Sequence, residues 1–293
     1  MTGGLYRALA WLARRIGLWV VAAFAWIVST GYFLLLPRRL TRCVRFYRAL
    51  FPDRGLVSAL GLAWRQYHGF AALFAERLRL QYDPDRLRCT MEGLEHLEQA
   101  AETGRGAILL MTHLGNWEIA ARILGQRNFK LLLYMGEKQR EQIERDQKTD
   151  LQRDGVRVVG LREGEDATVH GLEGLHFLKS GGLVSMAGDR NWSDDQPSLE
   201  VGMLGSKVSL PKAPHALALI TGSPVITFFV VRTGRLKFHF RAFAPRPVTA
   251  SARSERAAAL QQSAEHYVDQ LVEMLRQHPT QWYHFEPFLK PPQ

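Results

Sequence analysis

The chain has 293 residues, of which 46% are hydrophobic, and its formal net charge at pH 7 is +10. This composition excludes a largely disordered chain and fits one large domain with an appendage, or two small domains packed together. The positive charge predicts an anionic partner, which is nucleic acid, a membrane surface, or an acidic carrier or substrate. The two cysteines, Cys43 and Cys89, lie far apart in unlike contexts, which argues against a disulfide framework or a thiolate zinc site.

The first feature along the chain is an uncharged apolar run over residues 16–36, IGLWVVAAFAWIVSTGYFLLL. Its length is about the 20 residues that a helix needs to cross a bilayer. It ends in bulky residues and continues into a basic stretch, so it favours a retained membrane anchor over residues 1–40 rather than a cleaved signal peptide. A buried helical hairpin and a helix lying in the membrane interface are the alternatives.

Arginines follow the apolar run in larger number than they precede it. This bias modestly favours a C-terminal body on the cytoplasmic side of the membrane. Residues 41–87 carry arginine, leucine and aromatic residues at helical spacing, with a break at Pro52 and Asp53. We expect membrane-proximal amphipathic helices here, although helices that simply pack on the core fit the same pattern.

From residue 88 to residue 293 the pattern changes to strands alternating with helices. The predicted strands cover residues 107–112, 130–135, 156–160, 183–188, 224–232 and 236–243. The predicted helices cover residues 94–106, 117–125, 141–155, 165–182, 214–223 and 257–277. Short apolar strands that alternate with helices predict an α/β domain with a largely parallel central sheet, covered by helices on both faces.

One polar pair stands at the predicted end of the first of these strands. His113 follows the strand, and Glu118 lies a short way into the next helix, where a turn would bring its carboxylate back to the imidazole. An imidazole paired with a carboxylate suits a general base that takes a proton from a hydroxyl. A chance pair of polar residues has the same spacing. The sequence has neither the helical two-histidine zinc pattern nor a G-x-S-x-G elbow.

The block MTHLGNWE resembles the H-x4-D/E motif of the bacterial lipid A biosynthesis (late) acyltransferases, within the wider lysophospholipid and glycerolipid acyltransferases. Three later stretches also resemble family blocks in the family's order: LKSGGLVSMAGDRNW, MLGSKVSLPKAPHALALITGSPVITFFVVR and HPTQWYHFEPF. The resemblance implies an N-terminal anchor before an α/β catalytic domain. It also implies that His113 deprotonates an acceptor hydroxyl, which attacks a thioester, and that Glu118 supports His113.

Four further residues are candidates for contact with substrate. Arg162 follows a predicted strand, and its guanidinium suits a phosphate or a developing oxyanion, or else is a solvated loop group. Asp189 and Arg190 are expected at the same sheet edge by the resemblance, as an ion pair that shapes the pocket or as substrate contacts. Asn116 touches substrate or, as its position favours, caps the following helix.

The resulting functional prediction is an O-acyltransferase at the inner membrane. By the resemblance, its donor is an acyl carrier protein or coenzyme A thioester and its acceptor a membrane lipid or glycolipid, with no metal or organic cofactor and no nucleic acid. Family members tend to follow the closing aromatic pair with a basic stretch, whereas here residues 284–288 are HFEPF, so an acceptor other than lipid A stays open. A thioesterase with the same residues and a non-catalytic lipid-binding protein are the rival functions.

Overall fold

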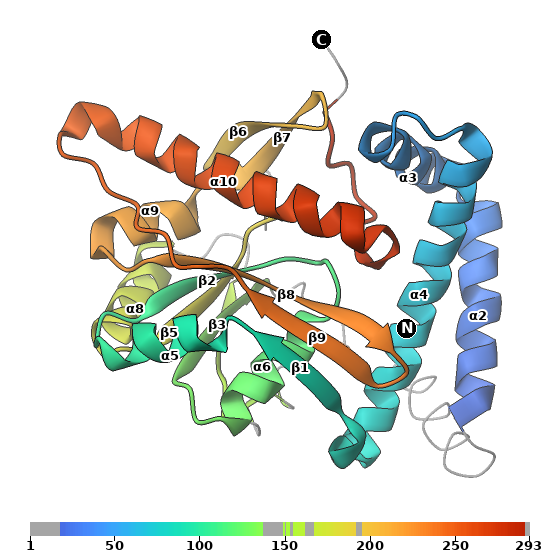
Figure 1. Cartoon of the computed structure of the whole chain (residues 1–293), viewed down its shortest axis with the longest axis horizontal. Coiled ribbons are helices and arrows are strands. Elements are labelled where there is room, and N and C mark those ends of the chain that lie inside the picture. The colour runs from blue at the N-terminus through green and yellow to red at the C-terminus, as the bar shows by residue number, and fades with distance from the viewer. Residues whose placement is uncertain are drawn as a thin grey trace.

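The computed structural model describes residues 18–136, 149, 151–152, 155–161, 167–191 and 195–290 (Figure 1). Its α-helices are α2 (Leu18–Leu35), α3 (Pro37–Leu50), α4 (Leu56–Tyr82), α5 (Leu94–Glu102), α6 (Trp117–Gln126), α8 (Ala167–Lys179), α9 (Ala213–Thr221) and α10 (Arg256–Gln277). Short 3-10 helices are η1 (Pro84–Arg86), η2 (Arg253–Glu255) and η3 (Pro279–Gln281). The strands are β1 (Arg88–Glu92), β2 (Ala107–Met111), β3 (Leu131–Gly136), β4 (Arg157–Leu161), β5 (Leu183–Ala187), β6 (Ser198–Met203), β7 (Ser206–Pro211), β8 (Val225–Gly234) and β9 (Lys237–Ala242).

A seven-stranded sheet in the order β1-β9-β8-β2-β5-β3-β4 forms the centre of the molecule. Its neighbouring strands are parallel, apart from the antiparallel pair β8–β9. The predicted α/β fold with a largely parallel sheet is therefore confirmed. The antiparallel pair arises because β8 and β9 are joined by a tight turn, which leaves no room for the crossover that a parallel connection needs.

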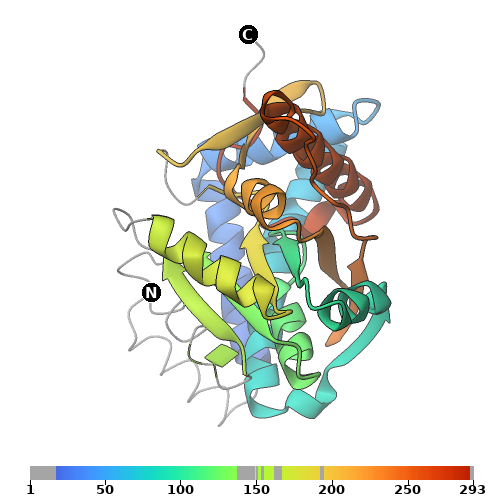
Figure 2. The same ribbon diagram turned by 90° about the vertical axis from the view of Figure 1, so that its left-hand side faces the viewer.

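Both faces of the sheet are covered by helices, as Figures 1 and 2 show. Side chains of β2 alternate between two apolar clusters, with Ile108 and Leu110 in one and Leu109 and Met111 in the other. The first cluster includes residues of α9 and α10, and the second includes residues of α5 and α6. The continuous apolar run of β2 is thus explained by burial on both faces of a central strand.

The antiparallel hairpin β6–β7 and the edge strand β1 were not among the predicted elements. The hairpin turns at Leu204 and Gly205, which have φ angles of +51° and +75°, as a two-residue hairpin turn requires. Its apolar residues alternate with Ser, Gly and Lys, and it packs against α10 (Figure 1). This alternation is the pattern of a half-buried hairpin whose apolar face packs against a helix.

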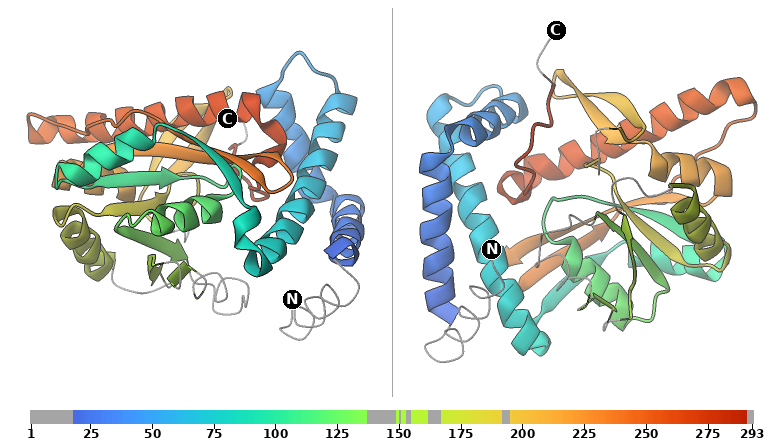
Figure 3. Two further views of the ribbon diagram at one scale, coloured as in Figure 1. Left: turned by 60° about the horizontal axis from the view of Figure 1, so that its bottom comes forward. Right: turned by 180° about the vertical axis from the view of Figure 1, so that it is seen from behind.

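The three N-terminal helices lie together at one end of the molecule, with α2 and α4 side by side and antiparallel (Figure 3). Helix α2 covers residues 18–35 of the predicted anchor, and Pro37 begins α3 after a break at Leu36. Among the described residues, no single helix has the length and apolar character to cross a membrane; residues 19–35 and 37–50 meet that criterion only as a pair, bent by 88°. The membrane anchor stays a prediction.

An ion pair with a buried carboxylate fastens α4 to the sheet. Glu76 of α4 is 7% exposed, and its carboxylate accepts hydrogen bonds from Arg232 of β8 through Nε at 2.9 Å and Nη2 at 2.7 Å. The backbone N–H of Leu236 donates to the same carboxylate at 3.3 Å. The hydrogen bond to Glu76 raises the pKa of Arg232. Because the Glu76 carboxylate accepts hydrogen bonds from both a side chain of β8 and the backbone that follows it, it holds α4 in one position against β8.

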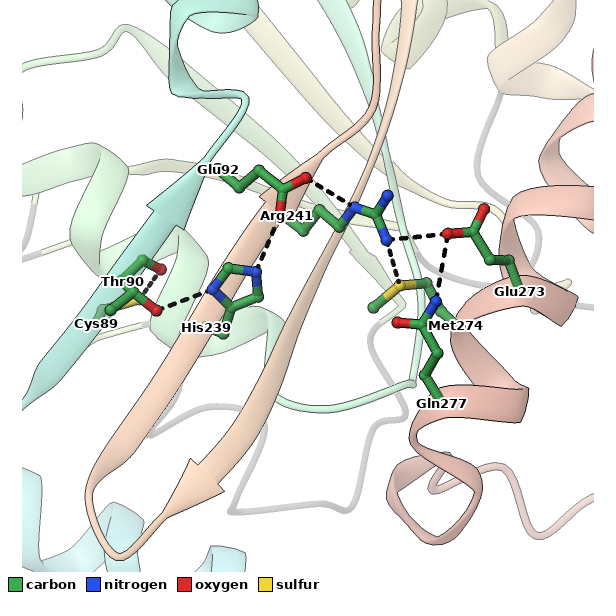
Figure 4. Close-up of polar contacts among 8 residues, drawn as sticks. All are labelled: Cys89, Thr90, Glu92, His239, Arg241, Glu273, Met274 and Gln277. Carbon is green, nitrogen blue, oxygen red and sulfur yellow. Dashed lines mark hydrogen bonds and ion pairs between the residues drawn. The ribbon is translucent and has the colours of Figure 1, made fainter.

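A second arginine, on the neighbouring strand β9, bridges two carboxylates (Figure 4). Arg241 of β9 lies 3.2 Å from Glu92 of β1 and 2.9 Å from Glu273 of α10. His239 contacts Glu92 and Thr90 on the neighbouring strand. Both glutamates are exposed, so water screens these pairs and each contributes little to stability.

We expect Arg232→Met to lower the free energy of unfolding by about 3 kcal/mol, because it leaves the Glu76 carboxylate buried without its cation. The matched change Arg241→Met, whose partners are exposed, is expected to cost less than about 1 kcal/mol. Urea denaturation of both variants measures the difference. Equal losses in the two variants would contradict the assignment of Glu76–Arg232 as the fastening between α4 and the sheet.

Candidate active site

The register of two central strands brings His113 and Asp189 together. Strands β2 and β5 are parallel neighbours in which Met111 faces Ala187, and each of the two polar residues follows its strand by two positions. The ladder continues past the strand ends, since the backbone N–H of Gly188 donates to the carbonyl of Met111 at 2.8 Å. The edge where parallel strands end is the usual place for functional groups in such sheets.

Asp189 is 1% exposed, and its carboxylate accepts three hydrogen bonds. Oδ1 lies 2.9 Å from Nδ1 of His113, while Oδ2 accepts from the backbone N–H of His113 at 2.8 Å and from Nε1 of Trp282 at 3.0 Å. Burial opposes ionisation, but the charge and the hydrogen bond of His113, together with His284 and the hydrogen bond of Trp282, outweigh it, so the pKa of Asp189 is lowered. The group is an anion held in a protein interior by its donors.

This contact defines the chemistry of the imidazole. A carboxylate on Nδ1 fixes the tautomer that carries hydrogen on Nδ1, so the lone pair lies on Nε2. The side chain of His113 is 26% exposed, which leaves it accessible from outside the sheet edge. The arrangement can take a proton from a bound hydroxyl and stabilise the imidazolium that forms.

The C-terminal segment, which comprises residues 278–290 after α10, completes the site by pairing with the chain around His113. Leu114 and Trp282 form an antiparallel bridge, and the backbone N–H of Tyr283 donates to the carbonyl of His113 at 2.9 Å. Gln66 of α4 donates through Nε2 to the carbonyl of Trp282. Helix α4, the loop after β2 and the C-terminal segment therefore hold one another around the imidazole.

Two glycines permit these close approaches. Gly115 has a φ of +80°, and a Cβ there would lie 1.9 Å from the carbonyl oxygen of Val230. A Cβ at Gly188 would lie 2.5 Å from the ring of Tyr267. A side chain at either position would displace the loop that carries His113 or Asp189.

In the structure, Asp189 takes the position on Nδ1 that the sequence assigned to Glu118. Glu118 is buried, and its carboxylate lies 3.2 Å from Nε of Arg77 in α4. The reason is the helix cap: Asn116 accepts from the backbone N–H groups of Glu118 and Ile119. The cap places Glu118 in the first turn of α6, beside α4, and confirms the predicted capping role of Asn116.

Asp189 and Arg190 were expected as an ion pair or as substrate contacts, and the structure gives each a different partner. Arg190 donates through Nη2 to Glu286 at 2.7 Å, which links the loop after β5 to the C-terminal segment. Arg162 lies outside the described residues. Trp282 and Gln66 were given no role by sequence reasoning. Trp282 belongs to the block HPTQWYHFEPF, which resembles the closing block of the family. That resemblance does not predict a contact between the indole and Asp189.

A cavity of about 200 Å³ opens beside this site, between α3, α4 and the C-terminal segment. Its lining is mostly aromatic and apolar, with arginines from α3, and comprises Arg42, Cys43, Arg45, Phe46, Gln66, Trp282, His284 and residues 285–289. Burial raises the pKa of the Cys43 thiol to about 11, so this cysteine is a packing group rather than a nucleophile. Within the described part of the chain, no three His, Cys, Asp or Glu side chains are placed to hold a metal ion.

The sequence model described as bacterial lipid A biosynthesis acyltransferase matches residues 51–291 of this chain. The chain belongs to that family. The matched residues include α4, the sheet, His113, Asp189 and Trp282, so the imidazole and the carboxylate that it contacts lie within the family domain, whereas α3 precedes it. The predicted membership of the lipid A acyltransferases is confirmed.

Curated relatives of this family member are mycobacterial. The phosphatidylinositol mannoside acyltransferase of Mycobacterium tuberculosis (strain ATCC 25618 / H37Rv) is 25% identical over 258 residues, covering 86% of this chain and 75% of the relative. The protein of the same name from Mycolicibacterium smegmatis (strain ATCC 700084 / mc(2)155) is 27% identical over 192 residues, covering 64% of this chain and 59% of the relative.

Because the pKa of Asp189 is lowered in the folded protein, its carboxylate adds stability above its unfolded pKa, and this stability disappears as the pH falls through the folded pKa. We expect Asp189→Asn to be about 2 kcal/mol less stable than wild type at pH 7. The difference should shrink below about pH 4. Denaturation curves at pH 7, 5 and 3 measure it. The exposed Asp269→Asn is the control, and a difference for Asp189→Asn that stays constant with pH would contradict the lowered pKa.

Proposed function

We propose that this family member is a membrane-associated O-acyltransferase that moves a fatty acyl chain from an acyl thioester to a hydroxyl of a glycolipid. The observation that carries the proposal is the contact between Nδ1 of His113 and the buried carboxylate of Asp189. This contact supports a role for His113 as general base, with its tautomer fixed, in a family of acyltransferases.

In the proposed reaction, Nε2 of His113 takes the proton of the acceptor hydroxyl while the oxygen attacks the thioester carbonyl. A tetrahedral oxyanion forms, the carbon–sulfur bond breaks, and the leaving thiolate takes the proton from His113. Asp189 holds the imidazole and stabilises its protonated form between these two steps. Glu118 supports the site through Arg77, because their pair keeps the start of α6 against α4.

The N-terminal helices support a position at the membrane. Exposed apolar residues are numerous on α2 and include Trp19, Ile27, Leu34 and Leu35. Helix α3 buries Cys43, Phe46, Tyr47 and Leu50 and carries its arginines on the other side. An apolar helix next to a basic one suits contact with the acyl region and the anionic headgroups of a bilayer. We propose the inner membrane, with the catalytic domain on the cytoplasmic side.

The cavity beside the site suits a lipid substrate. Aromatic side chains such as Phe46 and Phe288 provide an apolar lining, and Arg42 and Arg45 add cationic groups. Together they fit an acyl chain next to a phosphate. The mycobacterial relatives are named for a phosphoglycolipid acceptor, and we propose an acceptor of that chemical class. The donor is a thioester of acyl carrier protein or coenzyme A.

We expect His113→Ala to lower acyl transfer by 10²-fold or more, because it removes the base that activates the hydroxyl. Mass spectrometry of lipids from cells that express the wild type or the variant, in a host that lacks the native gene, detects the acylated product and gives its mass. A lipid that appears with wild type alone identifies the acceptor and the acyl chain together. Equal product from both proteins would contradict the proposed base.

The same comparison with purified full-length protein separates the rival functions. Wild type is incubated with an acyl thioester, with and without a glycolipid acceptor. Acyl transfer that needs the acceptor supports the proposal. Free fatty acid released at the same rate without the acceptor would identify a thioesterase, and glycolipid binding without any product would identify a lipid-binding protein.

Matched amide variants of Asp189 and Glu118 test which carboxylate is the partner of His113. We expect Asp189→Asn to lower kcat by about 10³-fold or more, because an amide cannot stabilise the imidazolium. Glu118→Gln should lower kcat by less than about 10-fold, since the pair with Arg77 is structural. Steady-state kinetics with wild type as reference give both values. A larger loss of kcat in Glu118→Gln than in Asp189→Asn would identify Glu118 as the catalytic partner of His113.

A further inference from the structure

A second imidazole stands beside the catalytic pair. The ring of His284 is stacked on Trp282, the residue that donates to Asp189, with centroids 5.1 Å apart and an angle of 25° between the planes. The edge of Phe288 packs against it at 5.0 Å. Its own ring lies 6.1 Å from that of His113, with the planes at 85°. His284 is therefore fixed by aromatic contacts on the side of the site that faces the cavity.

The Nδ1 atom of His284 is buried and has no hydrogen-bond partner among the residues that the structure describes. An unpartnered buried nitrogen is costly, and such atoms are rare in folded proteins unless a ligand satisfies them. Burial lowers the pKa of His284; Asp189 and Glu286 oppose this effect, whereas His113 and Arg190 add to it. The lowered pKa favours the neutral imidazole, which can donate one hydrogen bond without carrying a charge.

The segment that carries His284 is tied down on both sides. Trp282 is hydrogen-bonded to Asp189 and Gln66, and Glu286 forms the ion pair with Arg190. The imidazole therefore has little freedom to turn away when a substrate enters the cavity. Groups that stabilise a transition state are effective when they are held in this way before the reaction begins.

We propose that His284 is a substrate-contacting residue whose Nδ1–H donates a hydrogen bond to the carbonyl oxygen of the acyl thioester. The proposal rests on the acyl transfer proposed above and names the group that receives the negative charge. The hydroxyl bound to Nε2 of His113 and the carbonyl oxygen bound to His284 would each lie about 3 Å from their nitrogens. The rings of His113 and His284 stand edge to face with centroids 6.1 Å apart, which is close enough for one thioester group to contact both imidazoles.

The proposed arrangement accounts for each proton transferred and for each bond formed or broken. The acceptor hydroxyl gives its proton to His113, its oxygen bonds to the thioester carbon, and the carbonyl electrons move to the oxygen that His284 holds. When the intermediate collapses, the carbonyl re-forms, the carbon–sulfur bond breaks, and His113 protonates the thiolate. His284 keeps its proton throughout and acts as an electrophile, which suits a neutral imidazole.

The test compares His284→Phe and His284→Asn in the full-length protein. Phenylalanine keeps the stacking on Trp282 but has no N–H, whereas the asparagine amide places a donor close to the position of Nδ1. The control is His278→Phe, because His278 is a half-buried histidine on the same segment whose pKa is also lowered by burial. Transfer from an acyl-coenzyme A or acyl carrier protein thioester to a glycolipid is measured for each variant, together with thermal unfolding.

We expect His284→Phe to lower kcat by about 10²-fold with KM changed by less than about threefold, since the bond strengthens in the transition state. His284→Asn should recover roughly tenfold of that loss, and His278→Phe should remain within about twofold of wild type. Wild-type kcat in a folded His284→Phe, or a change in KM alone, would overturn the inference. So would equal losses in the phenylalanine and asparagine variants.

The results that would overturn the role of His284 differ from the results that would overturn the proposed function. If wild type transfers acyl groups and His284→Phe does so equally well, only the role of His284 is wrong. If wild type transfers no acyl group to any glycolipid, the proposed function and this inference both fail. Should His284→Phe not fold, the ratio of kcat between His284→Asn and wild type decides, with a loss of about tenfold expected and no loss overturning the inference.

Discussion

The carboxylate of Asp189 is the group on which the rest of the site depends. It is buried at the end of β5, and every one of its described donors belongs to another part of the chain: the side chain and backbone of His113, and the indole of Trp282. An unpaired carboxylate in this position would be very costly. Folding therefore has to bring the β2 loop and the C-terminal segment to the same place, and the geometry of the imidazole follows from that requirement.

The site is assembled from segments far apart in sequence, and their attachment to one another is polar. Gln66 joins α4 to the C-terminal segment, Arg77 joins α4 to α6, and Arg232 joins β8 to α4. Apolar burial alone tolerates small shifts between elements, whereas hydrogen bonds to charged groups have narrow geometry. These contacts explain how helices outside the sheet fix the position of a base at its edge.

The fold also places the reactive edge against the N-terminal helices. The cavity lined by Trp282 and His284 is bounded by α3, which carries exposed arginines, and α3 follows directly after the exposed apolar residues of α2. A lipid that approaches along this end of the molecule meets apolar surface, then cationic groups, then the imidazole. This order of environments is the reason for proposing a phosphoglycolipid acceptor.

The sequence by itself determined the α/β fold, because the apolar runs of β2, β3 and β5 and the helical periods between them are local patterns. It also singled out His113, which falls where a strand ends, and the Asn116 cap. The partner of the imidazole was decided by tertiary structure. Glu118 lies five residues from His113 and was the local choice, but the parallel register of β2 and β5 brings Asp189 to Nδ1 across 76 residues. The spacing of residues in the sequence indicates which groups lie close along the chain. Pairing between β2 and β5 is a long-range contact, so no local sequence pattern predicts it.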